Sequence, residues 1–184
     1  AASDVYKRQE DPLKVAVLMN AHALNSTQNI VCSGIQDALE QEKLQGSEIQ
    51  MSLITVDDTN TFSVEESIRD IFMDQTLPDI IICLNELSTT CVYQAVVDYN
   101  CVGEIAILGY YDTDTILKAI ERNVITATIS IDTEQMGAFC VDALQEYYNY
   151  GYTSQYFTAD VTVIDQSNVE EYLGKQEEAA VSYT

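Results

Sequence analysis

The side chains that could carry catalysis are few, and their spacing matches no common catalytic motif. His22 is the only histidine, so a Ser-His-Asp or Cys-His arrangement would have to use it, and no G-x-S-x-G segment marks a nucleophile. No G-x-G-x-x-G or G-x-x-x-x-G-K-[ST] loop is present to hold nucleotide phosphates. The sequence therefore predicts no catalytic residue, and we expect that the protein is not an enzyme.

Two pairs of carboxylates could in principle do acid–base chemistry. Asp57 stands next to Asp58, and Asp112 lies two residues before Asp114, with each pair directly after an apolar run. Aspartate in these positions is also typical of turns and of helix N-caps. For Asp112 and Asp114, which precede a predicted helix, capping is the favoured interpretation.

The cysteines do not have the spacing of a metal site. Their number is odd, no C-x-x-C occurs, and histidine partners are almost absent, so we predict neither zinc nor any other metal or cofactor. No Asp-x-Asp-x-Asp loop indicates a calcium site. All of them lie in apolar stretches and are expected to be buried, reduced thiols: Cys32, Cys83, Cys91, Cys101 and Cys140.

Charge and hydrophobicity limit the functions further. The 184 residues include 8 Lys and Arg against 30 Asp and Glu, a net charge of −22. A polyanion of this kind is repelled by phosphate backbones and anionic lipids, so we expect no nucleic acid to bind this segment. Hydrophobic residues make up 47% of the chain, which suits one globular domain with a sizeable core.

Short apolar runs alternate with segments of helical periodicity along the chain. Strands are predicted at Leu13–Met19, Gln50–Val56, Asp79–Leu84, Glu104–Gly109, Val124–Ile129 and Tyr156–Asp165. Helices are predicted at Thr27–Glu42, from a capping box at Ser63–Glu66 onward, at Leu87–Tyr99 and Thr113–Arg122, and from Asp132 to Asn149. The helix after Ser63 should bury the stripe Val64, Ile68, Ile71 and Phe72.

Strict alternation with short connections predicts an α/β fold: a doubly wound, Rossmann-like parallel sheet of about six strands with helices on both faces. Ligands of such sheets bind beyond the carboxyl ends of the strands. Residues 1–9 share no pattern with the rest, and we interpret them as a non-native leader. Residues 10–173 form the single domain, and residues 174–184 are expected to be a frayed tail.

Four stretches in this order resemble the periplasmic sugar-binding proteins of ABC transporters, of the type I, ribose-binding kind. Residues 79–87 (DIIICLNEL) resemble their strand followed by an asparagine turn, and residues 106–112 (AILGYYD) resemble their V-V-G-F-D strand end. Residues 125–137 (ITATISIDTEQMG) resemble their A-T-I-A-Q-x-P-x-x-M-G crossover. Residues 161–171 (VTVIDQSNVEE) resemble their closing strand, so the similarity extends over about residues 13–173.

The resemblance also implies which residues contact a ligand. Asn85 matches the turn asparagine, Phe62 falls where the family often stacks an aromatic ring on a sugar, and Tyr110, Tyr111 and Asp112 occupy the Gly-Phe-Asp strand end. Asn29 stands where ribose-type members have an arginine, and His22 follows the first strand. Tyr111 replaces the family's aspartate and Ile131 its glutamine. These departures argue against a common pentose or hexose and favour a smaller or more apolar ligand, or a degenerate site.

The family has two lobes that close on a ligand, and this chain resembles the C-terminal lobe. The resemblance thus implies an extracytoplasmic solute-binding protein, periplasmic or lipid-anchored, that delivers a sugar-like molecule to the membrane permease of an ABC transporter. The alternative is the cytoplasmic effector-binding domain of a LacI-type transcription regulator. Residues 132–156 would pack on the first lobe. We expect the helix at 132–149 to mediate self-association, or to dock on its own sheet, through Met136, Phe139, Cys140 and Leu144.

Overall fold

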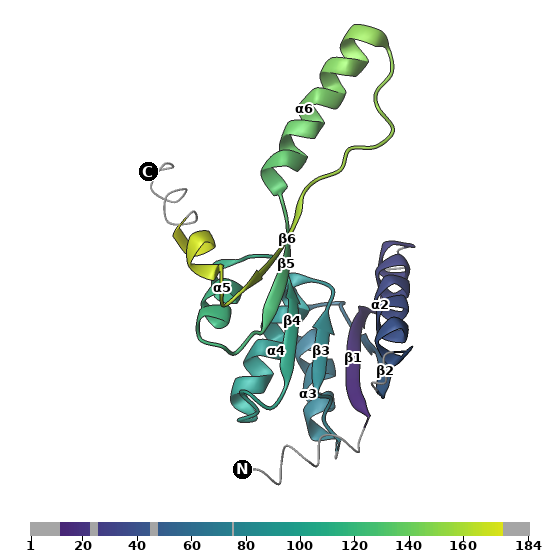
Figure 1. The fold of residues 1–184 in the computed structure, drawn as a ribbon. Helices are drawn as coiled ribbons and strands as arrows, with labels where there is room; N and C mark the ends of the chain where they lie inside the picture. The colour runs from purple at the N-terminus through teal and green to yellow at the C-terminus, as the bar shows by residue number, and fades with distance from the viewer. Residues whose placement is uncertain (1–11, 23–25, 45–47, 75, 175–184) are drawn as a thin grey trace.

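The computed structural model describes residues 12–22, 26–44, 48–74 and 76–174 (Figure 1). The segment interpreted as a leader, residues 1–9, lies outside these residues, and so does the segment expected to be a frayed tail, apart from its first residue, Gly174. Gly174 is the last residue of a short helix of residues 169–174, and the frayed tail stays a prediction.

The predicted alternation of strands and helices is confirmed, with boundaries that differ by a few residues at most ends. The elements are β1 (Leu13–Asn20), α2 (Ser26–Leu44), β2 (Ile49–Val56), α3 (Thr61–Met73), β3 (Ile80–Cys83), α4 (Glu86–Asp98), β4 (Ala106–Tyr110), α5 (Asp114–Glu121), β5 (Ala127–Ile131), α6 (Thr133–Tyr150) and β6 (Val161–Asp165). The largest difference is β6, which begins five residues later than the Tyr156 predicted from its alternating pattern.

The strands form one sheet in the order β2-β1-β3-β4-β5-β6. The first five are parallel, but β6 runs antiparallel to β5, with Ile129 opposite Val163. The expectation of a wholly parallel sheet was therefore wrong at one edge. The reason is that α6 does not cross back over the sheet, so the chain returns from the end at which it left and β6 must run in the opposite direction.

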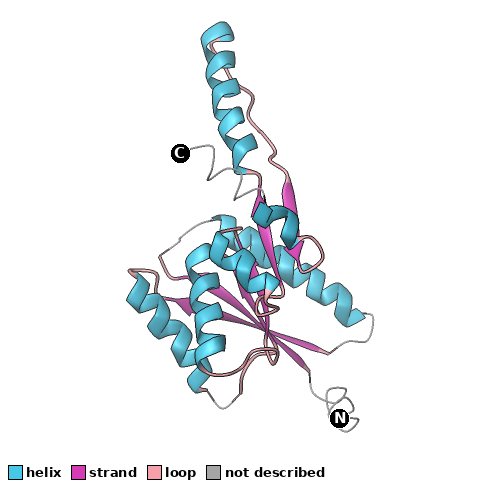
Figure 2. Cartoon of the chain, turned by 90° about the vertical axis from the view of Figure 1, so that its left-hand side faces the viewer, coloured by secondary structure: helices cyan, strands magenta, loops and turns pink. Residues whose placement is uncertain are grey.

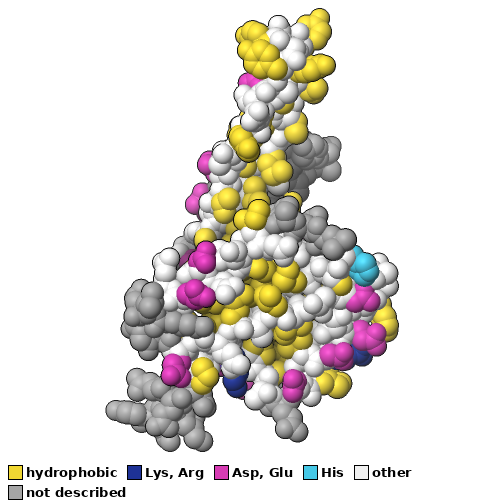
Figure 3. All heavy atoms as spheres, turned by 90° about the vertical axis from the view of Figure 1, so that its right-hand side faces the viewer, with side chains coloured by type: hydrophobic (Ala, Val, Ile, Leu, Met, Phe, Trp, Pro, Cys, Tyr) yellow, Lys and Arg dark blue, Asp and Glu magenta, His cyan; other side chains and the backbone are white. Residues whose placement is uncertain are grey.

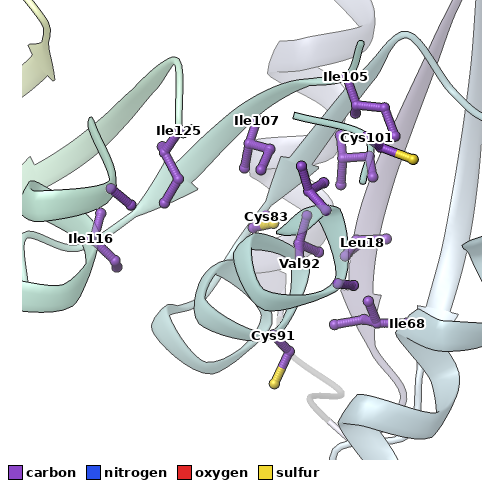
Figure 4. Packing of buried hydrophobic residues seen from close by; sticks show 14 of the residues in the cluster. Leu18, Ile68, Cys83, Cys91, Val92, Cys101, Ile105, Ile107, Ile116 and Ile125 are labelled. Carbon is purple, nitrogen blue, oxygen red and sulfur yellow. The ribbon is translucent and has the colours of Figure 1, made fainter. Parts of the chain in front are cut away.

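Helices lie on both faces of the sheet, as predicted, but they cover the faces unequally. The strand residues Val15 and Val17 pack with Cys32 of α2 over β1 and β2. Helices α3, α4 and α5 pack on the opposite face, where Leu18, Ile68, Val92, Ile107 and Ile116 belong to the main core (Figure 4). Figure 2 shows these helices and α2 on opposite sides of the sheet.

The predicted buried stripe of α3 is confirmed, whereas its predicted N-cap is wrong. Val64, Ile68, Ile71 and Phe72 are buried. The helix starts at Thr61, and its cap is Asn60, whose side-chain oxygen accepts from the Ser63 backbone N–H at 3.0 Å. Asn60 has the extended backbone that a capping residue requires, and Ser63 therefore lies inside the first turn.

Helix α6 and the segment that follows it project from the body as an arm, residues 133–160 (Figure 1). Asp132 caps α6 as predicted, because its carboxylate accepts from the Gln135 backbone N–H at 2.8 Å. The arm is clamped where it joins the sheet. The Asp132 N–H donates to the Asp160 carbonyl at 2.9 Å, the Gln135 amide donates to the Asp160 carboxylate at 2.7 Å, and the Asp160 N–H donates back to Gln135 Oε1 at 2.9 Å. The arm does not dock on its own sheet, so that alternative is wrong.

Four of the five cysteines are buried, as expected, and all five are free thiols. Cys140 is the exception, since it lies on α6 and is exposed. Burial raises the pKa of the Cys83 thiol to about 12, and it also raises the pKa of Cys91. These thiols are thus held in their neutral form by the core.

Candidate functional site

The candidate site lies at the carboxyl ends of the strands, between β1 and β3. The sheet order β2-β1-β3 places the next two strands of the chain on opposite sides of β1, so the connections diverge there. This topological switch point is where open α/β sheets bind ligands. A hollow of about 480 Å³ occurs at this point, lined by Asn20, Asp58, Val64, Asn85, Glu86, Leu87, Ser88, Tyr110 and Tyr111.

Two asparagines form the floor between the strands. Asn85 Nδ2 donates to Asn20 Oδ1 at 2.7 Å, which joins the last residue of β1 to the second residue after β3. The other end of the Asn85 amide caps α4, because Oδ1 accepts from the Ser88 N–H at 2.7 Å. The nitrogen and the oxygen of the Asn85 side-chain amide are therefore both hydrogen-bonded within the protein. These bonds fix the position of β1, β3 and α4 relative to one another at the site.

One wall of the hollow carries a carboxylate held by the histidine. His22 donates its backbone N–H to Asp58 Oδ1 at 2.9 Å, and its ring Nδ1 lies 2.9 Å from the same oxygen. Burial acts to raise the pKa of Asp58, but the contacts with His22 outweigh it and the pKa lies below its ordinary value. Next to it, hydrogen bonds from Thr59 lower the pKa of Asp57. The rim is thus negatively charged at neutral pH.

Another part of the lining is a pair of tyrosines. The rings of Tyr110 and Tyr111 meet edge to face with centroids 5.5 Å apart. Tyr111 has φ +80°, in the left-handed region that bulky residues rarely adopt. Two bonds hold it there: its N–H donates to the Ile129 carbonyl at 2.8 Å, and its carbonyl accepts from Thr128 Oγ1 at 2.6 Å. Strain of this kind often accompanies functional positions.

Two larger hollows occur, but their positions argue against them as the site. One of about 590 Å³ lies at the amino ends of the strands near Lys14 and Gly103, and one of about 600 Å³ lies along β2 and α3 near Ser52. Neither lies beyond the carboxyl ends of the strands, where polar side chains from separate connections converge. Volume alone therefore does not select the site.

The seven residues implied by the resemblance are only partly brought together. Asn85, Tyr110 and Tyr111 line the hollow, and His22 is attached to it through Asp58. Phe62 in the first turn of α3 and Asn29 in α2 are exposed and do not line it. Asp112 is half-buried just beyond Tyr111 and also lies outside the lining.

The sequence argument did not select four polar residues that line the hollow: Asn20, Asp58, Glu86 and Ser88. Asn20 could have been found as the last residue of the first strand, and Glu86 as the neighbour of Asn85. Asp58 had been noted only as one member of a carboxylate pair typical of turns. Ser88 carries no signal of its own, because it reaches the hollow through the first turn of α4.

The chemistry of this site is that of hydrogen bonding and ring contact. Carboxylates and tyrosine hydroxyls can pair with the hydroxyl groups of a polyol, and a tyrosine ring can cover its apolar face. No group of three or more His, Cys, Asp or Glu in the described part of the chain is arranged to hold a metal ion. Among the same residues, no helix has the length and apolar character needed to span a membrane.

Comparison with known proteins identifies solved structures that share this fold. No protein-family model matches the sequence, and no curated protein sequence matches it either. Solved structures do match. A glucose-galactose binding protein, GanP, from Geobacillus stearothermophilus is 17% identical with a TM-score of 0.73, over 90% of this chain and 57% of that protein. A Caulobacter myo-inositol binding protein is 19% identical with a TM-score of 0.73, over 95% and 59% respectively.

A periplasmic solute-binding protein of an ABC transporter from Actinobacillus succinogenes, solved with bound D-allose, matches in the same way. It is 13% identical with a TM-score of 0.73, over 93% of this chain and 59% of that protein. The chain thus has the fold of one lobe of the type I sugar-binding proteins of ABC transporters. This likeness confirms, for the fold, the resemblance carried by the four sequence stretches. The chain spans less than three fifths of the length of these three neighbours.

Proposed function

We propose that this protein is an extracytoplasmic solute-binding protein, and that the chain is the C-terminal lobe of a clamp that captures a sugar-like molecule for the permease of an ABC transporter. The observation that carries the proposal is the hollow at the switch point, where Asp58, Glu86 and the two tyrosines converge. Its neighbours in fold include proteins solved with myo-inositol and with D-allose. Among the described residues that line the hollow, none is a nucleophile paired with a base.

The nature of the lining favours a neutral ligand rich in hydroxyl groups. The hollow contains two carboxylates and no lysine or arginine, so an anionic solute would be repelled. A polyol instead supplies donors to the carboxylates and an apolar face to the Tyr111 ring, which is exposed toward the rim. The departures at Asn29 and Ile131 remain grounds for expecting a ligand other than a common pentose.

The position of the arm supports the assignment as a C-terminal lobe. Helix α6 leaves the carboxyl edge directly after β5, and the chain returns as β6 to the same sheet. This is the path that the resemblance implies for a crossover onto a first lobe and back. The regulator alternative predicts a cytoplasmic protein, so immunodetection in fractionated source cells separates the two.

A ligand screen with matched variants tests the binding function. Thermal unfolding is followed with myo-inositol, D-allose, D-galactose, D-xylose, nucleosides and amino acids, and a solute present at 100 times its Kd should stabilise the fold by ~2.7 kcal/mol. Asp58→Asn should abolish the shift. Asp37→Asn removes the same charge from an exposed position on α2 and should preserve it. If no polyol shifts the wild-type protein, or if both variants respond alike, the proposed site is wrong.

A further inference from the structure

Buried polar side chains occur in one part of the structure. Among the described residues, four Ser and Thr side chains and no Asn, Gln or charged side chain are buried: Ser88, Thr89, Thr128 and Ser130. The first two lie in the first turn of α4 and the other two in β5, the strand next to β4. Burial of a hydroxyl is unfavourable unless it is hydrogen-bonded, so this concentration around the end of β4 requires a reason.

Burial alone does not account for the threonine in β5. Thr128 is 1% exposed, whereas the next residue, Ile129, is 43% exposed on the opposite face of the same strand. Figure 3 shows further apolar side chains at the surface of the body beside the arm. Within the described residues, β5 thus buries a hydroxyl and exposes an isoleucine, the reverse of the ordinary preference of these side chains. The Thr128 hydroxyl is therefore better explained by the group that it binds.

The hydroxyls of Thr89 and Thr128 bind the backbone of the tyrosine pair at the end of β4. Thr89, which is fully buried, donates from Oγ1 to the Asn85 carbonyl at 2.7 Å and accepts from the Tyr110 N–H at 3.0 Å. Thr128 donates from Oγ1 to the Tyr111 carbonyl at 2.6 Å. The backbone of the pair is therefore held at its start by a residue of α4 and at its end by a residue of β5.

These bonds explain how two consecutive rings reach the same hollow. In a strand, successive side chains point to opposite faces. Tyr110 is the last residue of β4 and Tyr111 follows it, yet both line the hollow and their rings meet edge to face at 5.5 Å between centroids. The alternation is broken because Tyr111 leaves the extended conformation for φ +80°. A tyrosine keeps this unfavourable conformation only where its surroundings fix it.

Gly109 provides the space in which the two threonines converge. It pairs with Thr128 in the register of β4 and β5. A Cβ atom at this position would lie 2.6 Å from Thr89 Cγ2 and 3.2 Å from Thr128 Oγ1. Any larger residue would therefore displace the methyl group of one threonine and the hydroxyl of the other. The residue before the tyrosine pair is thus small because both hydroxyl contacts need its space.

We propose that Thr89 and Thr128 are positioning residues of the binding site, whose hydroxyls fix the backbone of Tyr110 and Tyr111 so that both rings contact the ligand together. Neither threonine lines the hollow, so each acts through the tyrosines. The ligand part of this inference rests on the function proposed above, since a polyol would meet an aromatic face and a phenolic hydroxyl in fixed relative positions. The bond from Thr89 to the Asn85 carbonyl connects the same arrangement to the segment that follows β3.

NMR spectroscopy of the 184-residue chain with isotope-labelled tyrosine rings tests the positioning without a ligand. The ring signals are assigned with Tyr110→Phe and Tyr111→Phe, and the nuclear Overhauser effect between the two rings reports their contact. Thr89→Val and Thr128→Val keep the shape of the side chain and remove its hydroxyl, so we expect the inter-ring effect to be lost. Thr89→Ser and Thr128→Ser keep the hydroxyl, so these variants should retain the effect.

Thr126→Val is the matched control for general destabilisation of the sheet. The Thr126 hydroxyl accepts from the Ile107 N–H of β4 at 3.3 Å, so it joins the same two strands at their amino ends, away from the tyrosines. Its loss should leave the inter-ring effect intact. Persistence of the effect in both Thr89→Val and Thr128→Val, or its equal loss in Thr126→Val, overturns the proposal.

Titration calorimetry with myo-inositol tests the consequence for binding. The Kd should rise about tenfold in the two valine variants at Thr89 and Thr128, because one ring contact of the ligand is lost. It should stay within about twofold of wild type in the two serine variants and in Thr126→Val. An unchanged Kd in variants that have lost the ring contact also overturns the proposal. The expected ring signals in a chain that binds no polyol would reject the proposed function alone, because the ring contact needs no ligand.

Discussion

Asn85 Nδ2 lies 2.7 Å from Asn20 Oδ1, and this bond joins two strands at the point where the chain connections diverge. The same Asn85 side chain caps α4 through the Ser88 N–H. A single amide thus fixes the relative position of β1, β3 and α4 beneath the hollow. The resemblance implies a ligand contact at Asn85, which stays a prediction, and the structure shows that both ends of its amide are bound within the protein.

Asn85→Ala should therefore destabilise the protein by more than the loss of a cap. Removal of a capping side chain costs about 1 kcal/mol, and the half-buried Asn20 side chain would also lose its partner, so we expect about 2 kcal/mol in urea unfolding. Asn60→Ala is the matched control, because Asn60 caps α3 and makes its other side-chain bond only within the same turn. It should cost about 1 kcal/mol. Equal losses would show that the Asn20 bond contributes nothing.

Tyr111→Gly should stabilise the backbone while it removes a ring from the site. Glycine adopts φ +80° without steric cost, whereas a bulky residue there is strained by about 1–3 kcal/mol. Tyr111→Ala removes the same ring and keeps the strain, so the Gly variant should be more stable than the Ala variant by about 1 kcal/mol or more in denaturant midpoints. Both should bind solute more weakly than wild type. An Ala variant as stable as the Gly variant would contradict the assignment of strain.

Gly109→Ala should destabilise the sheet through one identified contact. A methyl group at Gly109 would lie 2.6 Å from Thr89 Cγ2, which is too close for carbon atoms. We expect a loss of about 1–3 kcal/mol from this overpacking. Thr89→Ser removes that methyl and keeps the hydroxyl, which donates to the Asn85 carbonyl at 2.7 Å. The double variant should recover most of the loss, and strict additivity in the cycle would rule out the contact as the cause.

The buried Cys83 predicts a loss of stability in alkaline solution. Its pKa is raised by burial from 9.0 in the unfolded chain to about 12 in the fold. The folded protein therefore binds this proton more tightly, so the stabilisation is complete below pH 9 and declines as the pH rises from 9 toward 12. Cys83→Ala should flatten this part of the stability–pH curve, measured by urea unfolding. A curve unchanged by the substitution would assign the decline to other groups.

The local elements could be predicted because their signals are local. The stripe of Val64, Ile68, Ile71 and Phe72 identifies α3 whatever its neighbours are, and the apolar run at Ile80–Cys83 identifies a strand in the interior of the sheet. The cap of α3 was harder, since Asn60 and Ser63 are both good capping residues three positions apart. Backbone conformation, which the side-chain types do not reveal, decided between them.

The direction of the last strand, the order of the strands and the composition of the site could not be predicted from local sequence patterns. Val161 and Val163 alternate identically in a parallel or an antiparallel strand, so the direction of β6 followed only from the path of α6. The site depends on the sheet order β2-β1-β3, which places Asn20 beside Asn85 although 65 residues separate them. Phe62 and Asn29 lie on helices, where a rotation of about 100° per residue decides whether a side chain faces the hollow.

The clamp at Asp132 and Asp160 gives the arm the properties of a lever. The chain enters the arm at Asp132 and leaves it at Asp160, and these two residues are hydrogen-bonded to each other. The arm is therefore attached to the body at a single place, where β5 pairs with β6. A tilt of α6 about this attachment would displace both strands. The next residues affected along β5 include Thr128, whose hydroxyl holds the carbonyl of the strained Tyr111. Thr128 therefore links the strand that leads into the arm with Tyr111, which lines the hollow.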